Sequence, residues 1–547
     1  MEEADARTPL VADDEPVKPG SRAESSPDKP AVETLTNPWA LASLALPLAS
    51  FASGFSGAIA DVPIKYYFYD TLGLGASQYY LYSAVTSIPS NLVVLVGLLA
   101  DCAPLRGKRC KYYIAIGRIA WLVTYLRLAT SKTLGFAAIT WYSTAGALGD
   151  TLASSMGAML IVDRVKLEPE GRRGLFQATC MLASGVGKVC GQVAAAVTYG
   201  NDLHVPGFGD GFSIATIFAI VALVPTLLVV PLLPALHEPD TRGADVREPM
   251  AELGHLFGEL ARPAIYVPTL AFVITNLLIV DNEWHSVMLI DGCGPDVFTY
   301  AMLKVVQVTL MALATWAWRS TSLFYADFRH IILGAFFVYQ FFKYSDALGV
   351  HLVGGPWQPD KCIAWLGADD VAFDAASTVL GDASTIIVVL LCRGRRTGLL
   401  YLLLASITGT AGSLGGIACM YLGAVWPISD ANLIDGDYAN YIKLQFLATS
   451  ISMLAAPFFW YMLPGSREQL REVRCRACAA GRLRPQSARA RSIPFCDTLS
   501  LTPTRTQSFE RKPSPPSNTA IAVGLLVFWI GGMIATLGYG FWYTAPS

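Results

Sequence analysis

Charged residues are scarce in this sequence, since Asp, Glu, Lys and Arg make up only 15% of its 547 residues. Soluble domains carry roughly 25%, and the mean hydropathy of +0.44 also excludes a string of soluble domains. The net charge of −2 gives neither sign an excess, so nothing favours a nucleic-acid partner. The 11 cysteines have no regular spacing, which argues against a disulfide framework as the main support of the fold.

Motifs of enzymes and metal sites are missing as well. The sequence has no P-loop, no G-x-S-x-G elbow and no H-E-x-x-H motif, so we expect neither ATP hydrolysis nor hydrolase chemistry. Cys475 and Cys478 form a lone C-x-x-C without a second pair or a histidine, and we therefore expect no metal and no cofactor.

Long apolar blocks are abundant instead. A bilayer core about 30 Å thick needs roughly 20 mostly apolar residues per helix, and continuous runs of this length favour helices over barrel strands. The sequence predicts an all-α polytopic membrane protein with two six-helix bundles and a thirteenth, C-terminal helix. The expected spans are 40–66, 78–100, 112–131, 135–162, 175–199, 211–234, 263–283, 297–318, 329–348, 365–392, 398–426, 441–463 and 519–543.

The spans divide the chain into six parts: an acidic, disordered cytoplasmic tail (1–38), two helical halves (39–234 and 263–463), a cytoplasmic linker (235–262), a basic cytoplasmic tail (464–518) and the extra helix (519–543). The basic tail has eleven Lys or Arg against four Asp or Glu. It either contacts anionic lipid or is a solvated tail that enforces topology.

Basic residues lie in loops on one side of the predicted membrane. The loops 106–111, 163–173 and 392–398 are basic, whereas 199–210 and 430–437 are acidic or neutral. By the positive-inside rule the N-terminus is cytoplasmic. Cys293 and Cys362 fall in outer loops, where they either form a disulfide or remain free thiols.

The segment SIPSNLVVLVGLLADCAPLRGKRCKYY (87–113) contains a proline, then Gly and Asp, then Pro, Gly, a basic cluster and Tyr. With YDTLGLGASQ (69–78), Asp150 and GLFQATC (174–180), this segment resembles the folate–biopterin transporter family of the major facilitator superfamily. The resemblance covers mainly residues 60–191. It implies two six-helix halves and proton-coupled uptake or exchange of folates and pterins.

Two positions depart from that family's pattern. The Lys-Pro pair usual in its second span is Val93-Val94 here, and a second Asp expected one turn after Asp150 is Ser154. These differences bear on the substrate more than on the fold, so a carrier for an unrelated solute stays an alternative.

The basic loop after the second span has a physical interpretation of its own. Asp101 at a helix end can pair with Lys108 and Arg109 across a turn that contains Gly107, which joins two helices on the cytoplasmic side. Superfamily relatives use such a cluster as a gate. The alternative is that these residues only enforce topology.

Three ionisable residues lie near the centres of their spans, namely Asp150, Lys188 and Asp382. A charge at mid-bilayer costs about 2.5–3.5 kcal/mol on insertion scales, so these side chains should face one another, a hydrated cavity or a ligand. Asp150 and Lys188 lie at similar depth on consecutive helices, and we expect them to pair when no substrate is bound. Lys188 and Lys304 would attract an anionic solute, and Asp150 would release Lys188 when the solute binds. The alternative for Lys188 is a structural ion pair.

Asp374, Thr378 and Asp382 recur every four residues and form a polar stripe on one helix. The stripe suits proton coupling, with Asp382 exchanging a proton, or else it pairs with Lys343 and Lys304 on neighbouring spans. Further charges lie nearer the span ends; Asp61 and Lys65, one turn apart, form a candidate intrahelical pair. The other charges of this kind are Lys343 and Asp346.

The leading hypothesis is a secondary transporter with major facilitator fold, not an enzyme, whose partners are the bilayer, a small anionic solute and protons. This hypothesis requires a cavity lined by both halves. A non-transporting membrane sensor or scaffold is the alternative, and it requires central charges that are paired and sealed.

Overall fold

The computed structural model describes residues 32–463 and 520–532, with internal gaps. The gaps are 75, 132–133, 170–171, 200–211, 240–248, 280–284, 286–287, 294, 296, 354–358, 393–396, 427, 429–432, 434, 522 and 529. The segments 1–31, 464–519 and 533–547, which include most of the predicted acidic and basic tails, lie outside the described residues.

The described part is helical, and residues 45–232 form six helical units, of which all but α5 (Lys111–Thr130) are long and apolar enough to cross a membrane. A five-residue helix that the sequence did not predict, α1 (Val32–Thr36), precedes them. The second unit is broken where Pro89 starts a short 3₁₀ turn, η2 (Ile88–Leu92), because proline lacks the N–H that a continuous α-helix needs. The units are α2 (Ala45–Tyr66) with η1 (Tyr67–Thr71), α3 (Ala76–Ser87) with η2 and α4 (Val93–Cys102), α5 (Lys111–Thr130), α6 (Phe136–Leu167), α7 (Leu175–Thr198), and α8 (Ile214–Val229) with η4 (Val230–Leu232).

The second half repeats this pattern after the linker helix α9 (Pro249–Leu260). In its first unit α10 ends at Leu278, and the described residues that follow include the short π-turn η5 (Met288–Gly292). The elements are α10 (Pro263–Leu278), η5, α12 (Val297–Ser320), η6 (Ser322–Tyr325), α13 (Phe328–Val353), α14 (Pro359–Leu391), α15 (Thr397–Val425), α17 (Ala439–Met453) and α18 (Ala456–Met462).

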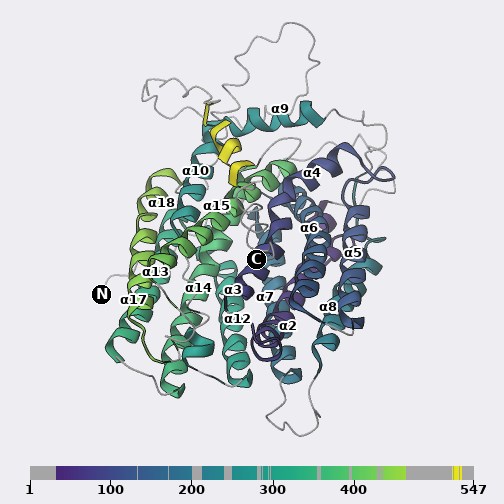
Figure 1. The fold of residues 1–547 in the computed structure, drawn as a ribbon. Helices are drawn as coiled ribbons and strands as arrows, with labels where there is room; N and C mark the ends of the chain where they lie inside the picture. The colour runs from purple at the N-terminus through teal and green to yellow at the C-terminus, as the bar shows by residue number, and fades with distance from the viewer. Residues whose placement is uncertain are drawn as a thin grey trace, which may run out of the picture.

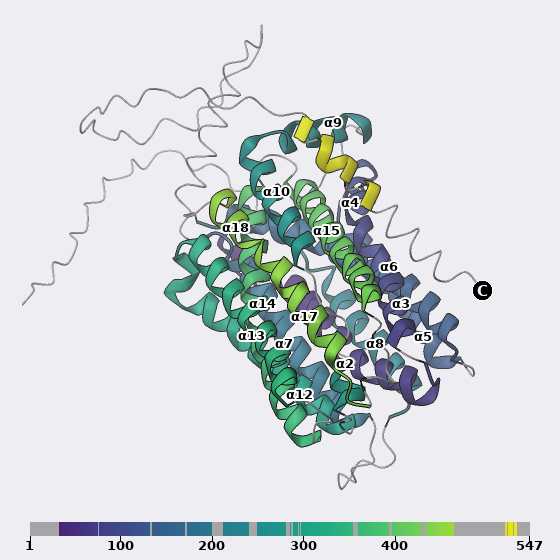
Figure 2. The ribbon, with the colours of Figure 1, turned by 60° about the vertical axis from the view of Figure 1, so that its left-hand side comes forward.

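The two halves lie side by side with their helices running in the same general direction (Figures 1 and 2). Across the boundary α7 packs against α12, and α15 packs against α4 and α6. The α9 helix marks one end of the bundle (Figure 1), called the α9 end below. Cys293 and Cys362 form a disulfide near the opposite end, which settles the pairing that the sequence left open.

Nine helices in the described ranges are long and apolar enough to cross a membrane. The helix α10 and the segment Val523–Gly532 are apolar but shorter. The segment Val523–Gly532 lies along α15, since a Cβ on Gly532 would be 2.5 Å from Thr410. The predicted thirteenth helix, 519–543, is described only in part, so a total of thirteen spans stays a prediction.

Glycines allow the first and fifth units to approach closely. A Cβ on Gly187 would lie 2.1 Å from the backbone oxygen of Phe51, and one on Gly191 would lie 2.3 Å from that of Phe55. From α2, Gly54 contacts the Ser184 oxygen in the same way. The α2–α7 interface is therefore held at a distance that only glycine permits.

Candidate functional site

Ionisable and amide side chains from several helices meet inside the second half. We call His285, Lys304, Gln307, Asp346, Asp370 and Asp374 the C-half polar network. Lys304 Nζ lies 3.0 Å from Asp370 Oδ2. Gln307 Nε2 donates to the same oxygen at 3.0 Å and also to Asp374. The α12 and α14 helices thus face each other through polar side chains in this network.

His285 joins this network from the chain between α10 and α12. Its Nδ1 is 3.5 Å from Asp346 Oδ2, and its Nε2 is 3.6 Å from Asp370 Oδ1. Nδ1 also lies 3.1 Å from the Tyr441 hydroxyl. One imidazole ring therefore faces carboxylates on α13 and α14 and a phenol on α17, so that four elements meet at a single titratable group.

The first half presents a charge pair to this network. Lys65 Nζ lies 3.3 Å from Asp61 Oδ1, which is the predicted intrahelical pair. Lys65 is only 8% exposed and its ammonium lies over the ring of Tyr79. Both Asp61 and Lys65 interact electrostatically with Lys304. Charges from both halves therefore meet at the boundary.

Asp150 does not pair with Lys188, so that expectation is wrong. Its Oδ1 accepts a hydrogen bond from Arg118 Nη1 at 2.7 Å, and Arg118 is 1% exposed. The cause lies in the α5–α6 contact, where a Cβ on Gly117 would be 2.5 Å from the Gly149 oxygen. This close approach brings Arg118 onto Asp150.

Lys188 has a different electrostatic partner, the carboxylate of Asp382 on α14. Asp382 Oδ2 also accepts a hydrogen bond from Thr315 Oγ1 at 2.7 Å. Lys188 belongs to the first half and Asp382 to the second, so this electrostatic interaction also crosses the boundary.

The predicted stripe on α14 faces α12 and is longer than the sequence analysis recognised. It begins with Asp370, four residues before Asp374. Thr378 donates to the backbone oxygen of Asp374 at 2.8 Å. The ammonium of Lys343 lies over the rings of Tyr339 and Phe373.

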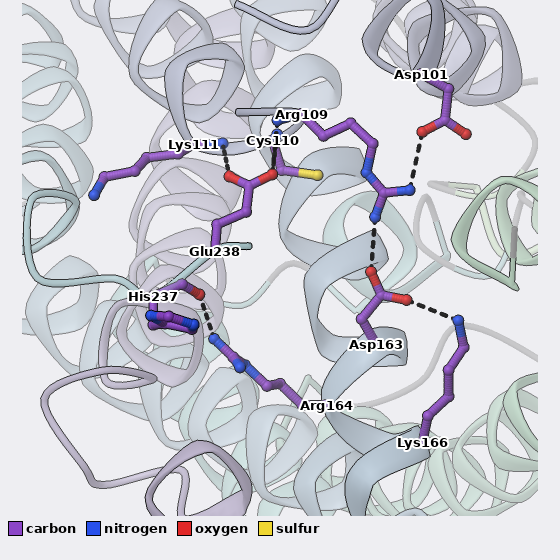
Figure 3. Close-up of polar contacts among 9 residues, drawn as sticks. All are labelled: Asp101, Arg109, Cys110, Lys111, Asp163, Arg164, Lys166, His237 and Glu238. Carbon is purple, nitrogen blue, oxygen red and sulfur yellow. Dashed lines mark hydrogen bonds and ion pairs between the residues drawn. The ribbon is translucent and has the colours of Figure 1, made fainter. Parts of the chain in front are cut away.

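The predicted gate residues form a cluster at the α9 end (Figure 3). Arg109 Nη1 is 3.1 Å from Asp101 Oδ1, and Arg109 Nη2 is 2.7 Å from Asp163 Oδ2. Gly107 turns the chain with φ +78°, and Lys108 Nζ donates to the backbone oxygen of Glu238 at 2.7 Å. Asp101, Asp163 and Glu238 all precede the linker helix α9 in the sequence.

Glu238 holds the start of α5 at this cluster (Figure 3). Its carboxylate accepts hydrogen bonds from the backbone N–H groups of Arg109, Cys110 and Lys111 at 2.7, 2.8 and 2.9 Å. An anionic side chain at a helix N-terminus satisfies otherwise unpaired donors. The beginning of the predicted linker 235–262 is therefore anchored to the first half.

Glu168 does the same for α7. Its carboxylate accepts from the N–H groups of Gly174 and Phe176, each at 2.6 Å. Burial raises the pKa of Glu168 to about 7, although these amides oppose the shift. Gly174 adopts φ +97° and lies near Ile386 and Phe324 of the second half, so Glu168 holds a helix end that touches both halves.

A cavity of about 280 Å³ lies between α10, α13, α14, α15 and α18. All its lining residues come from the second half, so this cavity is not the one lined by both halves that the sequence analysis required. No group of three or more metal-ligating side chains suited to a metal ion occurs among the described residues.

Several of these residues were missed by sequence reasoning, with different signals available. Arg118 and Asp370 are charged residues inside predicted spans, so the cost of burying charge could have identified them. His285 falls between two predicted spans, and Glu168 and Glu238 lie in loops, where a carboxylate carries no such signal.

Comparison with known proteins gives consistent results. The model of the BT1 family matches residues 53–340, more than half of the chain. Probable folate-biopterin transporter 4 of Arabidopsis thaliana is 27% identical over 182 residues, 33% of this chain and 35% of that protein. The folate-biopterin transporter of Synechocystis sp. is 25% identical over 225 residues, 40% of this chain and 42% of its own length. The chain therefore matches less than half the length of these curated relatives.

Solved structures share the arrangement of helices. A D-xylose-proton symporter has a TM-score of 0.55 at 14% identity, covering 80% of this chain and 99% of its own. The major facilitator superfamily proton:xylose symporter XylE has a TM-score of 0.53 at 14% identity, covering 81% and 98%. At such identities the likeness concerns the fold alone.

Proposed function

The chain belongs to the BT1 family, and from that membership we propose that it is a secondary active transporter for a small anionic folate- or pterin-like solute. Family and fold are those of membrane transporters with the major facilitator architecture, not of enzymes. The resemblance inferred from residues 60–191 is thereby confirmed. Solute, coupling ion and transport cycle are parts of the proposal.

The single observation that carries the proposal is the electrostatic interaction between charges of the two halves inside apolar helices. Lys304, held by Asp370 at 3.0 Å, faces the Asp61–Lys65 pair of the first half. Lys188 faces Asp382 across the same boundary. Inserting a charged group into an apolar helix costs about 2.5–3.5 kcal/mol on insertion scales. A transporter has a reason to keep such groups, because they bind its solute and its protons. In the proposed cycle Lys188 and Lys304 attract the solute's negative charge.

Protons are the proposed coupling ion, and His285 is the group added by the structure. Its two ring nitrogens face Asp346 and Asp370 at 3.5 and 3.6 Å, so a proton can pass among these groups. Asp374 and Asp382 remain proposed members of the proton path. Asp150, held by Arg118, is given a positioning role on α6 in place of its predicted role with Lys188.

Alternating access is supported by contacts between the halves at both ends. At the α9 end Arg319 donates to Thr179 Oγ1 at 3.0 Å. At the opposite end the Tyr66 hydroxyl lies 3.5 Å from the Pro295 oxygen. In the proposed cycle the halves rock so that one set of contacts opens while the other holds. The Asp101–Arg109 cluster would stiffen the first half during this motion.

The proposed orientation places the α9 end in the cytoplasm, because the basic loop 106–111 lies there beside Asp163 and Lys166, at the start of the basic loop 163–173. The six-part division of the chain and the contact of the basic tail with anionic lipid are proposals as well.

The test is uptake of radiolabelled folate and biopterin into proteoliposomes with an imposed pH gradient. Lys304→Gln should lower uptake at least tenfold, whereas Lys443→Gln, which replaces an exposed lysine on α17, should leave it within twofold. Normal uptake by the Lys304 variant would remove this residue from the mechanism. An absence of folate and biopterin uptake by the parent protein would refute the proposed solute class.

The sensor alternative draws on one observation, the pairing of Arg118 with Asp150 and of Lys304 with Asp370. It predicts no uptake of any solute. Binding of pterin without uptake in the same vesicles would favour it.

A further inference from the structure

The cavity inside the second half has walls of a distinct character. Aromatic rings from four helices line it: Phe272, Tyr339, Tyr401 and Phe459. No Asp, Glu, Lys, Arg or His is among its lining residues. Its volume of about 280 Å³ is close to the roughly 300 Å³ at which small-molecule pockets begin. These properties suit an uncharged, flat group of the size of one fused bicyclic ring.

Several polar atoms of the cavity can accept hydrogen bonds. The hydroxyls of Ser377, Ser384 and Thr408 each donate to a backbone oxygen of their own helix, at 3.0, 2.7 and 2.9 Å. Each hydroxyl oxygen therefore keeps lone pairs for another donor. Asn276 donates one N–H to the Phe272 oxygen at 2.7 Å, which leaves its amide oxygen for a ligand. A ligand that fits this lining brings several N–H donors.

We propose that this cavity holds an amino-substituted, fused heteroaromatic ring, and that it is the ring subsite of the transported solute. This inference rests on the proposed function, which it deepens by separating a neutral ring site from the charged network. The aromatic walls stack on the ring, and the hydroxyl and amide oxygens accept from its ring and exocyclic N–H groups.

The position of the cavity along α14 joins it to the C-half polar network. Ser377 lines the cavity and lies seven residues after Asp370, a rise of about 10 Å along a helix. A ring in the cavity thus leaves an anionic tail free to extend toward Lys304. Ring and tail are recognised at different places on the same helix.

The test uses the purified full-length protein and two probes, biopterin and 4-aminobenzoylglutamate, which has the anionic tail of folate but no pterin ring. Gly381 lines the cavity and a Cβ on it would meet no atom within 4 Å, so Gly381→Leu fills the cavity without a clash at the first added atom. The matched control is Gly412→Leu, whose Cβ is equally unobstructed and which lies outside the lining.

Biopterin affinity, measured by isothermal titration, should fall at least tenfold in Gly381→Leu and stay within twofold in Gly412→Leu. Affinity for 4-aminobenzoylglutamate should change less than that for biopterin. Should Gly381→Leu fail to fold, Thr408→Val removes a lining hydroxyl at nearly constant volume and should weaken biopterin several-fold, against Thr144→Val as its control on α6.

Unchanged biopterin affinity in Gly381→Leu or in Thr408→Val would overturn the ring subsite and leave the proposed function intact, provided that the parent transports pterin. If the parent binds neither probe, the solute class itself is wrong, and the ring subsite falls with it.

Discussion

Arg118 is the residue whose pairing the sequence did not reveal, and it makes a direct prediction. It is 1% exposed and its Nη1 lies 2.7 Å from Asp150. Its Nε has no partner among the described residues. Breaking a buried pair by removing one member costs about 3–5 kcal/mol. Asp150→Asn should therefore lower the stability of the detergent-purified protein by several kcal/mol, measured by thermal or denaturant unfolding.

A double-mutant cycle decides which cation Asp150 contacts. Arg118→Gln combined with Asp150→Asn should cost clearly less than the sum of the single variants. Lys188→Gln combined with Asp150→Asn should be additive. Additivity in the first cycle and coupling in the second would restore the Asp150–Lys188 pair.

His285 gives a second prediction that concerns a single residue. Histidine is the side chain that in ordinary surroundings changes charge near neutral pH, and His285 is surrounded by groups of both signs. Replacement by Gln keeps a hydrogen-bonding side chain but cannot carry the proton. Proton-driven uptake by His285→Gln should fall at least tenfold, and its dependence on pH between 5 and 8 should flatten. The titratable groups that face His285 are Lys304, Asp346, Asp369, Asp370, Asp374 and Tyr441.

The control for this variant is His330→Gln, because His330 is largely exposed near the α9 end of α13. Its pH profile should match that of the parent. A steep parental profile retained by His285→Gln would assign proton coupling to other groups, with Asp374 and Asp382 next in line.

At the scale of elements, the start of α7 depends on the protonation of Glu168. Burial raises the pKa of Glu168 from 4.5 to about 7. The folded protein thus keeps a proton on this carboxyl at pH values where the unfolded chain has lost it. The contribution of this pKa difference to the free energy of unfolding is complete below about pH 4.5 and is lost as the pH rises through about 7.

Melting temperatures between pH 5 and pH 8 check this expectation. Glu168→Gln is neutral at every pH, so its melting temperature should fall less from pH 5 to pH 8 than that of the parent. Equal slopes for the two proteins would show that Glu168 does not titrate in this range.

The α2–α7 interface supplies another prediction for elements. A Cβ on Gly187 of α7 would lie 2.1 Å from the Phe51 oxygen of α2. A Cβ on Gly57 of α2 would meet no atom within 4 Å. Gly187→Ala should lower stability by about 1–3 kcal/mol through overpacking, and Gly57→Ala should have little effect or stabilise the helix slightly. Equal effects in thermal unfolding would contradict the close approach.

These elements also indicate what a sequence can predict. Apolar length locates the spans, and charge cost identifies residues such as Lys188, Lys304 and Asp382 as unusual. Pairing partners depend instead on helix rotation and separation, which are set by contacts such as Gly117 on Gly149. That is why Arg118, and not Lys188, lies on Asp150. Capping carboxylates such as Glu238 act on helices far away in the sequence, where no local pattern indicates them.

At the scale of the whole molecule, the relation between the halves is the feature on which transport depends. The fold class follows from hydropathy and is confirmed by the solved relatives. Many contacts across the boundary carry no hydropathy signal, because they join apolar residues on both sides. At the α9 end, Gly97 of α4 packs on Leu399 and Leu402 of α15. Alternating access requires these contacts to separate.

A cross-link at the same end tests that requirement. A Cβ on Gly398 would lie 3.0 Å from the Cβ of Met159 on α6, slightly below the roughly 3.5–4.5 Å found in disulfides. Oxidised Met159→Cys/Gly398→Cys should therefore hold the halves together at the α9 end and abolish uptake, and a reductant should restore it. Met159→Cys alone should transport under both conditions. The parent with reductant controls for the native Cys293–Cys362 disulfide. Undiminished uptake by the fully cross-linked protein, with cross-linking verified by mass spectrometry, would refute a cycle in which this end opens.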